Sequence, residues 1–348
     1  MAASDGALRL LIAGGGTGGH VMPALAVAEQ LRDEAPESAV RFVGAEGGLE
    51  ARLVPQHGFQ IDLLRVGKLK GAAWLARART LAGLAPAVAR AAGIVRRFAP
   101  DVIVGVGGYA SAPVALAARF TGRPMVLLEQ NAIPGFTNRV LSRLAERVVV
   151  SFAETGRYFP RPERTVYLGN PVRPALLAAL RARAAAADAA AATRRDSTTL
   201  LVVGGSQGAR RINELVCEIA PELLAKRPRL RLVHQCGETD APWVRERHAA
   251  HGAAERVRVH AFIDDMVAAY LGADVLLGRA GATTIAEISV AGLPALLVPY
   301  PYAADDHQSA NARALVDAGA AQMVRQDALD GARLLEALAA LIDDDARR

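Results

Sequence analysis

Two glycine-rich segments of the sequence could bind a phosphate group. The first is GGGTGGH at residues 14–20, and the second is GGSQGA at residues 204–209. Each follows an apolar run typical of a buried strand and precedes a stretch with helical spacing. Glycines let the backbone approach a ligand closely, and the helix behind them presents free N–H groups and a partial positive charge. Two such segments, about half a chain apart, predict two similar α/β domains that face a shared cleft.

The first segment also fits a dinucleotide-binding fingerprint. Gly14, Gly16 and Gly19 follow the pattern G-x-G-x-x-G, and Glu46 stands at the end of the next predicted strand. An acidic residue in that place would bind the ribose of NAD or FAD. His20 argues against this interpretation, because it puts an imidazole at the helix start beside the predicted cleft. An NAD- or FAD-dependent oxidoreductase stays as an alternative that flavin absorbance or nicotinamide-dependent turnover would support.

A better nucleotide site is predicted in the second half, in RAGATTIAE at residues 279–287. Gly281 follows a predicted strand, and Thr283 and Glu287 fall on the first two turns of the helix behind it. An ionised carboxylate only accepts hydrogen bonds, so Glu287 is suited to two neighbouring ribose hydroxyls. No metal site is predicted, because neither H-x-x-x-H nor H-E-x-x-H occurs.

The apolar runs predict the scaffold that positions these segments. The runs are short, rich in Val, Ile and Leu, and lack polar alternation, as in strands buried on both faces of a parallel sheet. Helical stretches fill the gaps, so both halves are predicted as β-α-β units that bind ligands beyond the carboxyl ends of their strands. The predicted strands are Leu8–Ala13, Val40–Val43, Asp101–Val106, Pro124–Leu128, Arg147–Ser151, Thr199–Val203, Arg229–Gln235, Arg256–His260, Asp274–Leu277 and Ala295–Pro299.

The length of the chain predicts two domains with a boundary near residue 170. A chain of 348 residues exceeds one ordinary hydrophobic core. Residues 1–170 are predicted as one Rossmann-like domain, and residues 171–348 as a second. An Ala- and Arg-rich connector at about 177–196 is predicted as a surface helix or a loose linker.

Composition and charge limit the compartment and the partners. Cys217 and Cys236 are too few for a disulfide framework and predict reduced, buried thiols. The N-terminus has no signal-peptide pattern, and no run of about 18 apolar residues predicts a membrane span. Net charge is +6, yet residues 65–97 hold eight Lys or Arg and no acidic residue. With Trp74 among its cations, this segment suits an anionic membrane surface, and a solvated Arg-rich helix face is the alternative. Aromatic residues do not alternate with these cations and no nucleic-acid motif appears, so no nucleic acid is expected as a partner.

Eight motifs in a fixed order resemble one family, the bacterial peptidoglycan glycosyltransferases that convert lipid I to lipid II. The motifs are GGGTGGHVMPALAVA, VGVGGYASAP, EQNAIPGFTN, GNPVR, VVGGSQGA, FIDDM, RAGATTIAE and AGLPALLVPYP. The resemblance implies a GT-B fold and transfer of N-acetylglucosamine (GlcNAc) from UDP-GlcNAc to lipid I. It also implies a peripheral protein at the cytoplasmic face of the bacterial inner membrane that needs no cofactor or metal. A GT-B transferase with another lipid or natural-product acceptor is one alternative, and a non-catalytic membrane-binding scaffold is another.

The same resemblance implies that the C-terminal domain binds most of the donor. Ser206 and the adjoining N–H groups would hold the diphosphate, an anion at a helix start. Ile263 would meet the uracil through its backbone, Glu287 would take the ribose hydroxyls, and Gln308 would contact the sugar. The complete predicted UDP-GlcNAc site is Thr17, Gly18, Gly19, Asn131, Arg173, Ser206, Ile263, Ala282, Thr283, Thr284, Ile285, Ala286, Glu287 and Gln308.

For the acceptor, the resemblance implies an inverting displacement in which the muramoyl 4-hydroxyl attacks the anomeric carbon of GlcNAc and UDP leaves. His20 is predicted as the general base, kept neutral by the helix N-terminus. Hydrogen bonding by His20 without proton transfer is one alternative, and Glu129 as the base is another. Arg279 and backbone N–H groups would assist the departure of UDP. Lipid I is expected to meet the first glycine segment, with contacts from Gly15, Gly16 and Tyr109.

Three positions depart from the family pattern. Leu128 stands where the family often has His, Ala280 where it has Ser, and His307 where it commonly has Gln. No role is therefore transferred to Leu128 or Ala280.

Overall fold

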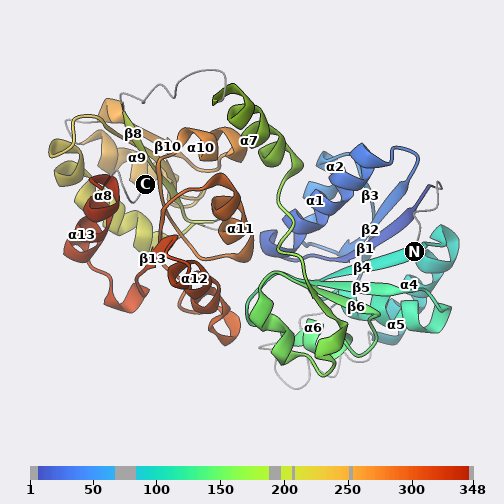
Figure 1. The fold of residues 1–348 in the computed structure, drawn as a ribbon. Helices are drawn as coiled ribbons and strands as arrows, with labels where there is room; N and C mark the ends of the chain where they lie inside the picture. Colours follow the sequence, from blue (N-terminus) through green and yellow to red (C-terminus); the bar gives the residue numbers. More distant parts are fainter. Residues whose placement is uncertain (1–6, 67–83, 188–196, 206–207, 251–253, 345–348) are drawn as a thin grey trace. The chain divides into compact units, whose positions relative to one another are not determined.

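The protein consists of two compact units, Met1–Pro174 (the N-terminal unit) and Ala175–Arg348 (the C-terminal unit). The structure is a computed structural model that describes residues 7–66, 84–187, 197–205, 208–250 and 254–344 (Figure 1). Each unit is built on one sheet, and every described strand pair in both sheets is parallel. The predicted α/β class with two Rossmann-like parallel-sheet domains is confirmed.

The N-terminal unit has a seven-stranded sheet in the order β3-β2-β1-β4-β5-β6-β7. Its centre is apolar on both faces because successive side chains of a strand point to opposite sides. Leu11 of the central strand β1 belongs to one core cluster, while Leu10 and Ile12 belong to the other. The strands are β1 (Arg9–Gly14), β2 (Ala39–Ala45), β3 (Gln60–Leu64), β4 (Val102–Gly107), β5 (Met125–Glu129), β6 (Arg147–Val150) and β7 (Thr165–Tyr167).

Helices cover both faces of this sheet. The helix that follows β1 contributes Leu25 to the cluster of Ile12, and the helix before β4 contributes Ile94 to the cluster of Leu11. The helices are α1 (Gly18–Glu34), α2 (Glu50–Gln56), α4 (Leu84–Phe98), α5 (Ser111–Thr121), α6 (Phe136–Leu141), the 3-10 turns η1 (Ala153–Tyr158) and η2 (Pro162–Arg164), and α7 (Pro174–Ala187), which continues into the C-terminal unit.

The C-terminal unit has a six-stranded sheet in the order β10-β9-β8-β11-β12-β13. Ile212 of α8 and Leu338 of α13 pack with Leu277 of β11 in its largest core cluster. Its elements are β8 (Thr198–Val203), α8 (Arg210–Ala225), β9 (Leu230–Gln235), α9 (Ala241–Ala249), η3 (Ala254–Arg256), β10 (Val257–His260), α10 (Met266–Gly272), β11 (Val275–Gly278), α11 (Ala282–Ala291), β12 (Ala295–Leu297), η4 (Ala304–Asp306), α12 (His307–Asp317), β13 (Ala321–Met323), η5 (Gln326–Ala328) and α13 (Gly331–Ile342).

In both units the strand order reverses beside the strand that carries the glycine segment. β1 lies between β2 and β4, and β8 lies between β9 and β11. Because the strands are parallel, the loops after β1 and β4 leave the same edge of their sheet, as do the loops after β8 and β11. Ligands of open parallel sheets bind at such a reversal. The fold therefore gives each unit one candidate site at the carboxyl ends of its central strands.

Ten strands were predicted, and the described residues contain these and three further ones. The additional strands β3, β7 and β13 each lie at an edge of a sheet. The connector region is helical as far as Ala187 in α7, and its residues 188–196 lie outside the described residues. Cys217 and Cys236 are both buried and free. Within the described ranges, no helix combines the length and the apolar character needed to cross a bilayer.

Candidate functional site

The first glycine segment packs directly against the loop that follows β4. Gly15 N donates a hydrogen bond of 3.1 Å to Gly107 O. A Cβ on Gly14 would overlap with Gly107 O, and a Cβ on Gly108 would overlap with Gly15 O. Only glycines permit this backbone-to-backbone contact, so the two loops form one surface at the β1/β4 reversal.

His20 lies on the first turn of α1 with one ring nitrogen held by the glycine segment. Its Nδ1 is 3.1 Å from Gly15 O and 3.3 Å from Thr17 Oγ1. A carbonyl oxygen only accepts, so the contact with Gly15 O favours the tautomer with the proton on Nδ1 and the lone pair of neutral His20 on Nε2. Nε2 faces the loop after β4, since a Cβ on Gly107 would lie 3.1 Å from it. This is the nitrogen that can accept a proton from a substrate.

A buried carboxylate, which the sequence did not single out, holds the middle of the same segment. Gly16 N donates to Glu50 Oε2 at 2.6 Å, and Glu50 is only 2% exposed. The N–H groups of Gly15 and Gly16 are therefore both engaged within the protein. Their amides already have acceptors and are not available to donate to lipid I. The contact predicted between these two glycines and lipid I is therefore one of close backbone approach without a hydrogen bond from either amide.

The ends of β4 and β5 bring two more predicted residues to this edge of the sheet. Tyr109 is partly exposed at 36%, and the N–H of Asn131 donates to Glu129 Oε1 at 2.9 Å. Glu129 Oε2 also accepts hydrogen bonds from Gly135 N at 3.1 Å and Asn138 Nδ2 at 2.9 Å. Burial raises the pKa of Glu129, and these hydrogen bonds oppose that rise. Its contacts are those of a residue that holds the loop after β5 in shape.

The second glycine segment follows β8 in the C-terminal unit. Gly208 N donates to Gly205 O at 3.1 Å, and α8 starts at Arg210. A Cβ on Gly208 would overlap with Cys236 O of the loop after β9, so the segment lies against that loop. Ser206, the predicted diphosphate ligand, lies outside the described residues.

Gln235, at the end of β9, connects the second glycine segment to the predicted uracil site. Its Oε1 accepts a hydrogen bond of 3.0 Å from Ile263 N, and its Nε2 donates to Gly205 O at 3.4 Å. Because the N–H of Ile263 donates to Gln235, the carbonyl of Ile263 is the backbone group that remains for a contact with the predicted uracil. Gln235 could not be predicted as a site residue, because its partners are 28 and 30 residues away.

The helix after β11 carries the largest group of predicted donor contacts. The helix α11 begins after Gly281, whose backbone is extended at the N-cap, and the predicted residues 282–287 form its first two turns. Glu287 is 2% exposed, and its Oε2 accepts a hydrogen bond of 2.9 Å from Tyr270 OH. Thr283 Oγ1 is buried and has no hydrogen-bond partner among the described residues. A buried hydroxyl without a partner is costly, which suggests that a ligand supplies one.

The start of α12 carries Gln308, the predicted sugar contact, with His307 beside it. Gln308 lies at the start of α12 and accepts from Tyr300 N at 2.9 Å, while His307 Nδ1 lies 2.7 Å from Ala304 O. Asn311, which was not predicted, donates to Ala280 O at 3.1 Å and fixes the loop before α11. These contacts orient the loops whose side chains were predicted to contact the sugar.

The guanidinium of Arg279, predicted to assist the departure of UDP, donates its hydrogen bonds to residues of the C-terminal unit. Its Nη1 donates to the carbonyls of Val298 and Pro299, both at 3.1 Å, and its Nη2 donates to Gln326 Oε1 at 2.6 Å. Desolvation by burial lowers the pKa of Arg279 to about 10. Arg173, the remaining predicted donor residue, lies half-buried in the segment after β7, at the end of the N-terminal unit.

Three buried side chains form a separate cluster behind β9. His234 Nδ1 lies 3.2 Å from His248 Nε2, and Cys217 Sγ lies 3.6 Å from the same nitrogen. Their donor atoms all lie within 4.8 Å of one another, close enough to share a metal ion. They come from α8, β9 and α9, so short-range spacing could not reveal the cluster. The sequence predicted no metal site in this protein, and that prediction is not tested by the cluster.

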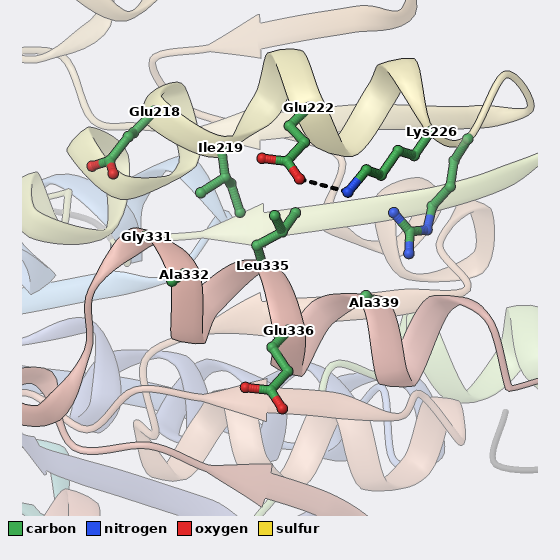
Figure 2. Close-up of a pocket in the computed structure, with 10 residues that line it drawn as sticks. Glu218, Ile219, Glu222, Lys226, Gly331, Ala332, Leu335, Glu336 and Ala339 are labelled. Carbon is green, nitrogen blue, oxygen red and sulfur yellow. Dashed lines mark hydrogen bonds and ion pairs between the residues drawn. The ribbon is translucent and has the colours of Figure 1, made fainter.

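A groove between α8 and α13 contains none of the predicted residues. Figure 2 shows Ile219 and Leu335 pointing toward each other between the two helices, and Glu222 Oε1 accepts a hydrogen bond of 2.6 Å from Lys226 Nζ. The groove is a seam between two packed helices and lies outside both glycine segments.

Two parallel-sheet units, each with its strand order reversed beside a glycine segment, are the architecture of the GT-B glycosyltransferases. The chain matches the glycosyltransferase family 28 N-terminal domain over residues 10–150 and the family 28 C-terminal domain over residues 199–348. It belongs to glycosyltransferase family 28.

Similar proteins cover nearly the whole chain. Two relatives are called UDP-N-acetylglucosamine–N-acetylmuramyl-(pentapeptide) pyrophosphoryl-undecaprenol N-acetylglucosamine transferase. The one from Geobacter metallireducens is 44% identical over 98% of this chain and 91% of its own length. The one from Magnetococcus marinus is 46% identical over 94% and 86%. The crystal structure of Acinetobacter baumannii MurG aligns with a TM-score of 0.73 at 33% identity, covering 96% of this chain and 90% of that one.

Proposed function

We propose that this protein is an inverting transferase that moves GlcNAc from UDP-GlcNAc to the muramoyl 4-hydroxyl of lipid I, giving lipid II for peptidoglycan synthesis. The observation that carries the proposal is the similarity to relatives named for this reaction, at 44–46% identity over almost the full chain. Family 28 domains in both halves and the position of His20 support it.

The C-terminal unit binds most of the donor in this proposal. Glu287 accepts hydrogen bonds from the ribose hydroxyls, and Tyr270 holds it in place. The carbonyl of Ile263 accepts from the uracil, because its N–H is engaged by Gln235. The second glycine segment with Ser206 holds the diphosphate at the start of α8. The remaining donor contacts are assigned to Thr17, Gly18, Gly19, Asn131, Arg173, Ala282, Thr283, Thr284, Ile285, Ala286 and Gln308.

The N-terminal unit binds the acceptor and supplies the base. His20 Nε2 takes the proton of the muramoyl 4-hydroxyl while the oxygen attacks the anomeric carbon of GlcNAc. The bond between that carbon and the UDP oxygen breaks, UDP leaves with the electron pair, and the configuration inverts. The backbone N–H groups at the second glycine segment stabilise the charge that develops on UDP. Tyr109 and the exposed surface of Gly16 approach the acceptor.

We also propose that the protein attaches peripherally to the cytoplasmic face of the bacterial inner membrane. The acceptor of the proposed reaction carries an undecaprenyl tail. Residues 65–97 contain eight Lys or Arg and no acidic residue. Within that segment the described residues include Arg90, Arg96 and Arg97, all exposed on α4, while residues 67–83 with Trp74 lie outside the described residues. Lys and Arg near a surface attract anionic lipid headgroups.

The structure disfavours the dinucleotide alternative at the first glycine segment. The N–H of Gly16, which a dinucleotide pyrophosphate would use at this segment, already donates to the Glu50 carboxylate. Glu46, the candidate ribose ligand, is exposed and paired with Arg65 across 3.1 Å. The oxidoreductase interpretation therefore has no support from the contacts of either residue.

A transfer assay tests the proposed function. Purified protein is incubated with UDP-[14C]GlcNAc and a lipid I analogue, and the label in the lipid product is counted. The proposal predicts label in the lipid and release of UDP. No label in the lipid fraction overturns it, and transfer to a different lipid acceptor alone would support the other GT-B alternative. Calorimetry with UDP-GlcNAc, UDP-GalNAc and NADH is the matching test of the donor, for which only UDP-GlcNAc should bind tightly.

A further inference from the structure

Glu50 and His20 bind opposite sides of one peptide group. The carbonyl of the Gly15–Gly16 peptide lies 3.1 Å from His20 Nδ1, and the N–H of the same peptide donates to Glu50 Oε2 at 2.6 Å. We propose that Glu50 is a positioning residue that fixes the tautomer and the orientation of His20 through this peptide. The inference rests on the proposed role of His20 as the general base.

The surroundings of Glu50 are shaped for its carboxylate. Its second oxygen, Oε1, accepts a hydrogen bond of 2.8 Å from Ala45 N at the end of β2. A Cβ on Gly15, Gly44 or Gly48 would overlap with the Glu50 side chain. Gly15 of the first glycine segment, Gly44 of β2 and Gly48 of the loop after β2 thus leave the space that the carboxylate fills. Burying a carboxylate costs free energy unless it is hydrogen-bonded, and here both oxygens of Glu50 accept a hydrogen bond from a backbone N–H.

The charge of Glu50 acts on His20 through the polarity of the peptide. A hydrogen bond from an N–H to a carboxylate is stronger than one to a neutral oxygen. Chains of hydrogen bonds polarise one another, so the Gly15 carbonyl becomes a better acceptor for His20 Nδ1–H. The proton is thereby held on Nδ1, and the lone pair stays on Nε2, which faces the loop at Gly107. The buried negative charge also stabilises the imidazolium that forms when Nε2 takes a proton.

The arrangement resembles a catalytic triad in which a peptide group lies between the carboxylate and the imidazole. In a serine protease an aspartate bonds to the histidine directly and holds the correct tautomer. Here the carboxylate is on α2, the imidazole is on α1, and the glycine segment connects them.

The test compares Glu50→Gln with Glu46→Gln. Glu50→Gln keeps the size and one acceptor oxygen and removes the charge, while Glu46→Gln makes the same change at an exposed residue paired with Arg65. Imidazole 15N NMR reports the tautomer of His20 without any need for activity. Transfer to a lipid I analogue is measured in both variants, with and without His20→Ala.

We expect wild-type His20 to be the Nδ1–H tautomer and Glu50→Gln to gain the Nε2–H tautomer. In this variant we expect kcat to fall roughly 10- to 100-fold. Mutation of residues that orient a metal-ligating side chain through a hydrogen bond has an effect of this size. The KM for UDP-GlcNAc is unchanged, and adding the variant to His20→Ala lowers kcat no further. Glu46→Gln matches the wild type in every measurement.

Two results would overturn the inference. One is an Nε2–H tautomer in the wild-type protein, which needs no variant and so holds even if Glu50→Gln fails to fold. The other is an equal loss of kcat from Glu50→Gln in the presence and absence of His20, which would mark a merely structural role. A wild-type protein that does not transfer to lipid I would contradict the proposed function instead, while the NMR result would still decide the tautomer.

Discussion

The hydroxyl of Tyr270 donates a hydrogen bond of 2.9 Å to Oε2 of Glu287, and both side chains are buried. Tyr270 comes from α10 and Glu287 from the second turn of α11, so the bond joins two neighbouring helices at the proposed ribose site. It fixes one oxygen of a carboxylate that is proposed to accept hydrogen bonds from the donor. The orientation of Glu287 therefore depends on a residue of a different helix.

Removing the Tyr270 hydroxyl should weaken nucleotide binding through the ribose alone. For Tyr270→Phe we expect the Kd of UDP to rise roughly 3- to 10-fold, corresponding to the net energy of about one hydrogen bond. The Kd of 2′,3′-dideoxy-UDP should change much less, because that ligand lacks the hydroxyls that Glu287 binds. Calorimetry with both ligands measures the difference. Tyr302→Phe, at a residue that is 81% exposed, is the control; an equal loss for both ligands would contradict the ribose assignment.

Thr283 offers a test in which affinity and stability move differently. Its buried Oγ1 has no partner among the described residues, so Thr283→Val removes an unsatisfied group. We expect the free protein to keep its melting temperature or gain slightly, while the Kd of UDP-GlcNAc rises roughly 3- to 10-fold. Ser289→Ala on the same helix is the control, because Ser289 Oγ bonds to Ile285 O at 2.7 Å. Lower stability with unchanged affinity would show that Thr283 serves packing only.

His234 should make the stability of the C-terminal unit depend on pH. Desolvation by burial, with a smaller effect of His248, lowers the pKa of His234 from 6.5 to about 3. The unfolded state then binds a proton that the folded state refuses, so stability is complete above pH 6.5 and falls as pH drops from 6.5 towards 3. The slope is at most about 1.4 kcal/mol per pH unit for one such group.

Urea unfolding between pH 7.5 and 5 measures this slope. Trp243 lies in the C-terminal unit, and its fluorescence reports that unit in a Trp74→Phe background. We expect His234→Gln to flatten the dependence of the unfolding free energy on pH. His57→Gln, in the N-terminal unit, should leave it unchanged. A slope that is the same in the wild type and in His234→Gln would rule out the assignment to His234.

The central strands could be predicted from the sequence and three edge strands could not. Buried strands such as β1 and β8 are continuous apolar runs, because both of their faces are covered. The edge strands β3, β7 and β13 contain QIDLL, TVY and AQM, which are short and partly polar. Half of an edge strand faces solvent, so its sequence resembles a loop, and only pairing with the neighbouring strand makes it regular.

The loops of the site could be predicted, but the residues that hold them could not. Glycine segments and the run of Thr and Glu after β11 are local patterns that suggest their chemistry. Glu50, Gln235 and Tyr270 act on partners 34, 28 and 17 residues away. Nothing in their own neighbourhoods indicates those partners, because the contacts arise only when the strands assemble.

The central claim is that His20 at the first glycine segment is the base of the transfer reaction. The most direct measurement is kcat for transfer of GlcNAc to a lipid I analogue by His20→Ala, together with its Kd for UDP. We predict a kcat lower by roughly 10²–10⁴ with unchanged UDP affinity, since a positioned base contributes that factor. A kcat close to that of the wild-type protein would contradict the claim.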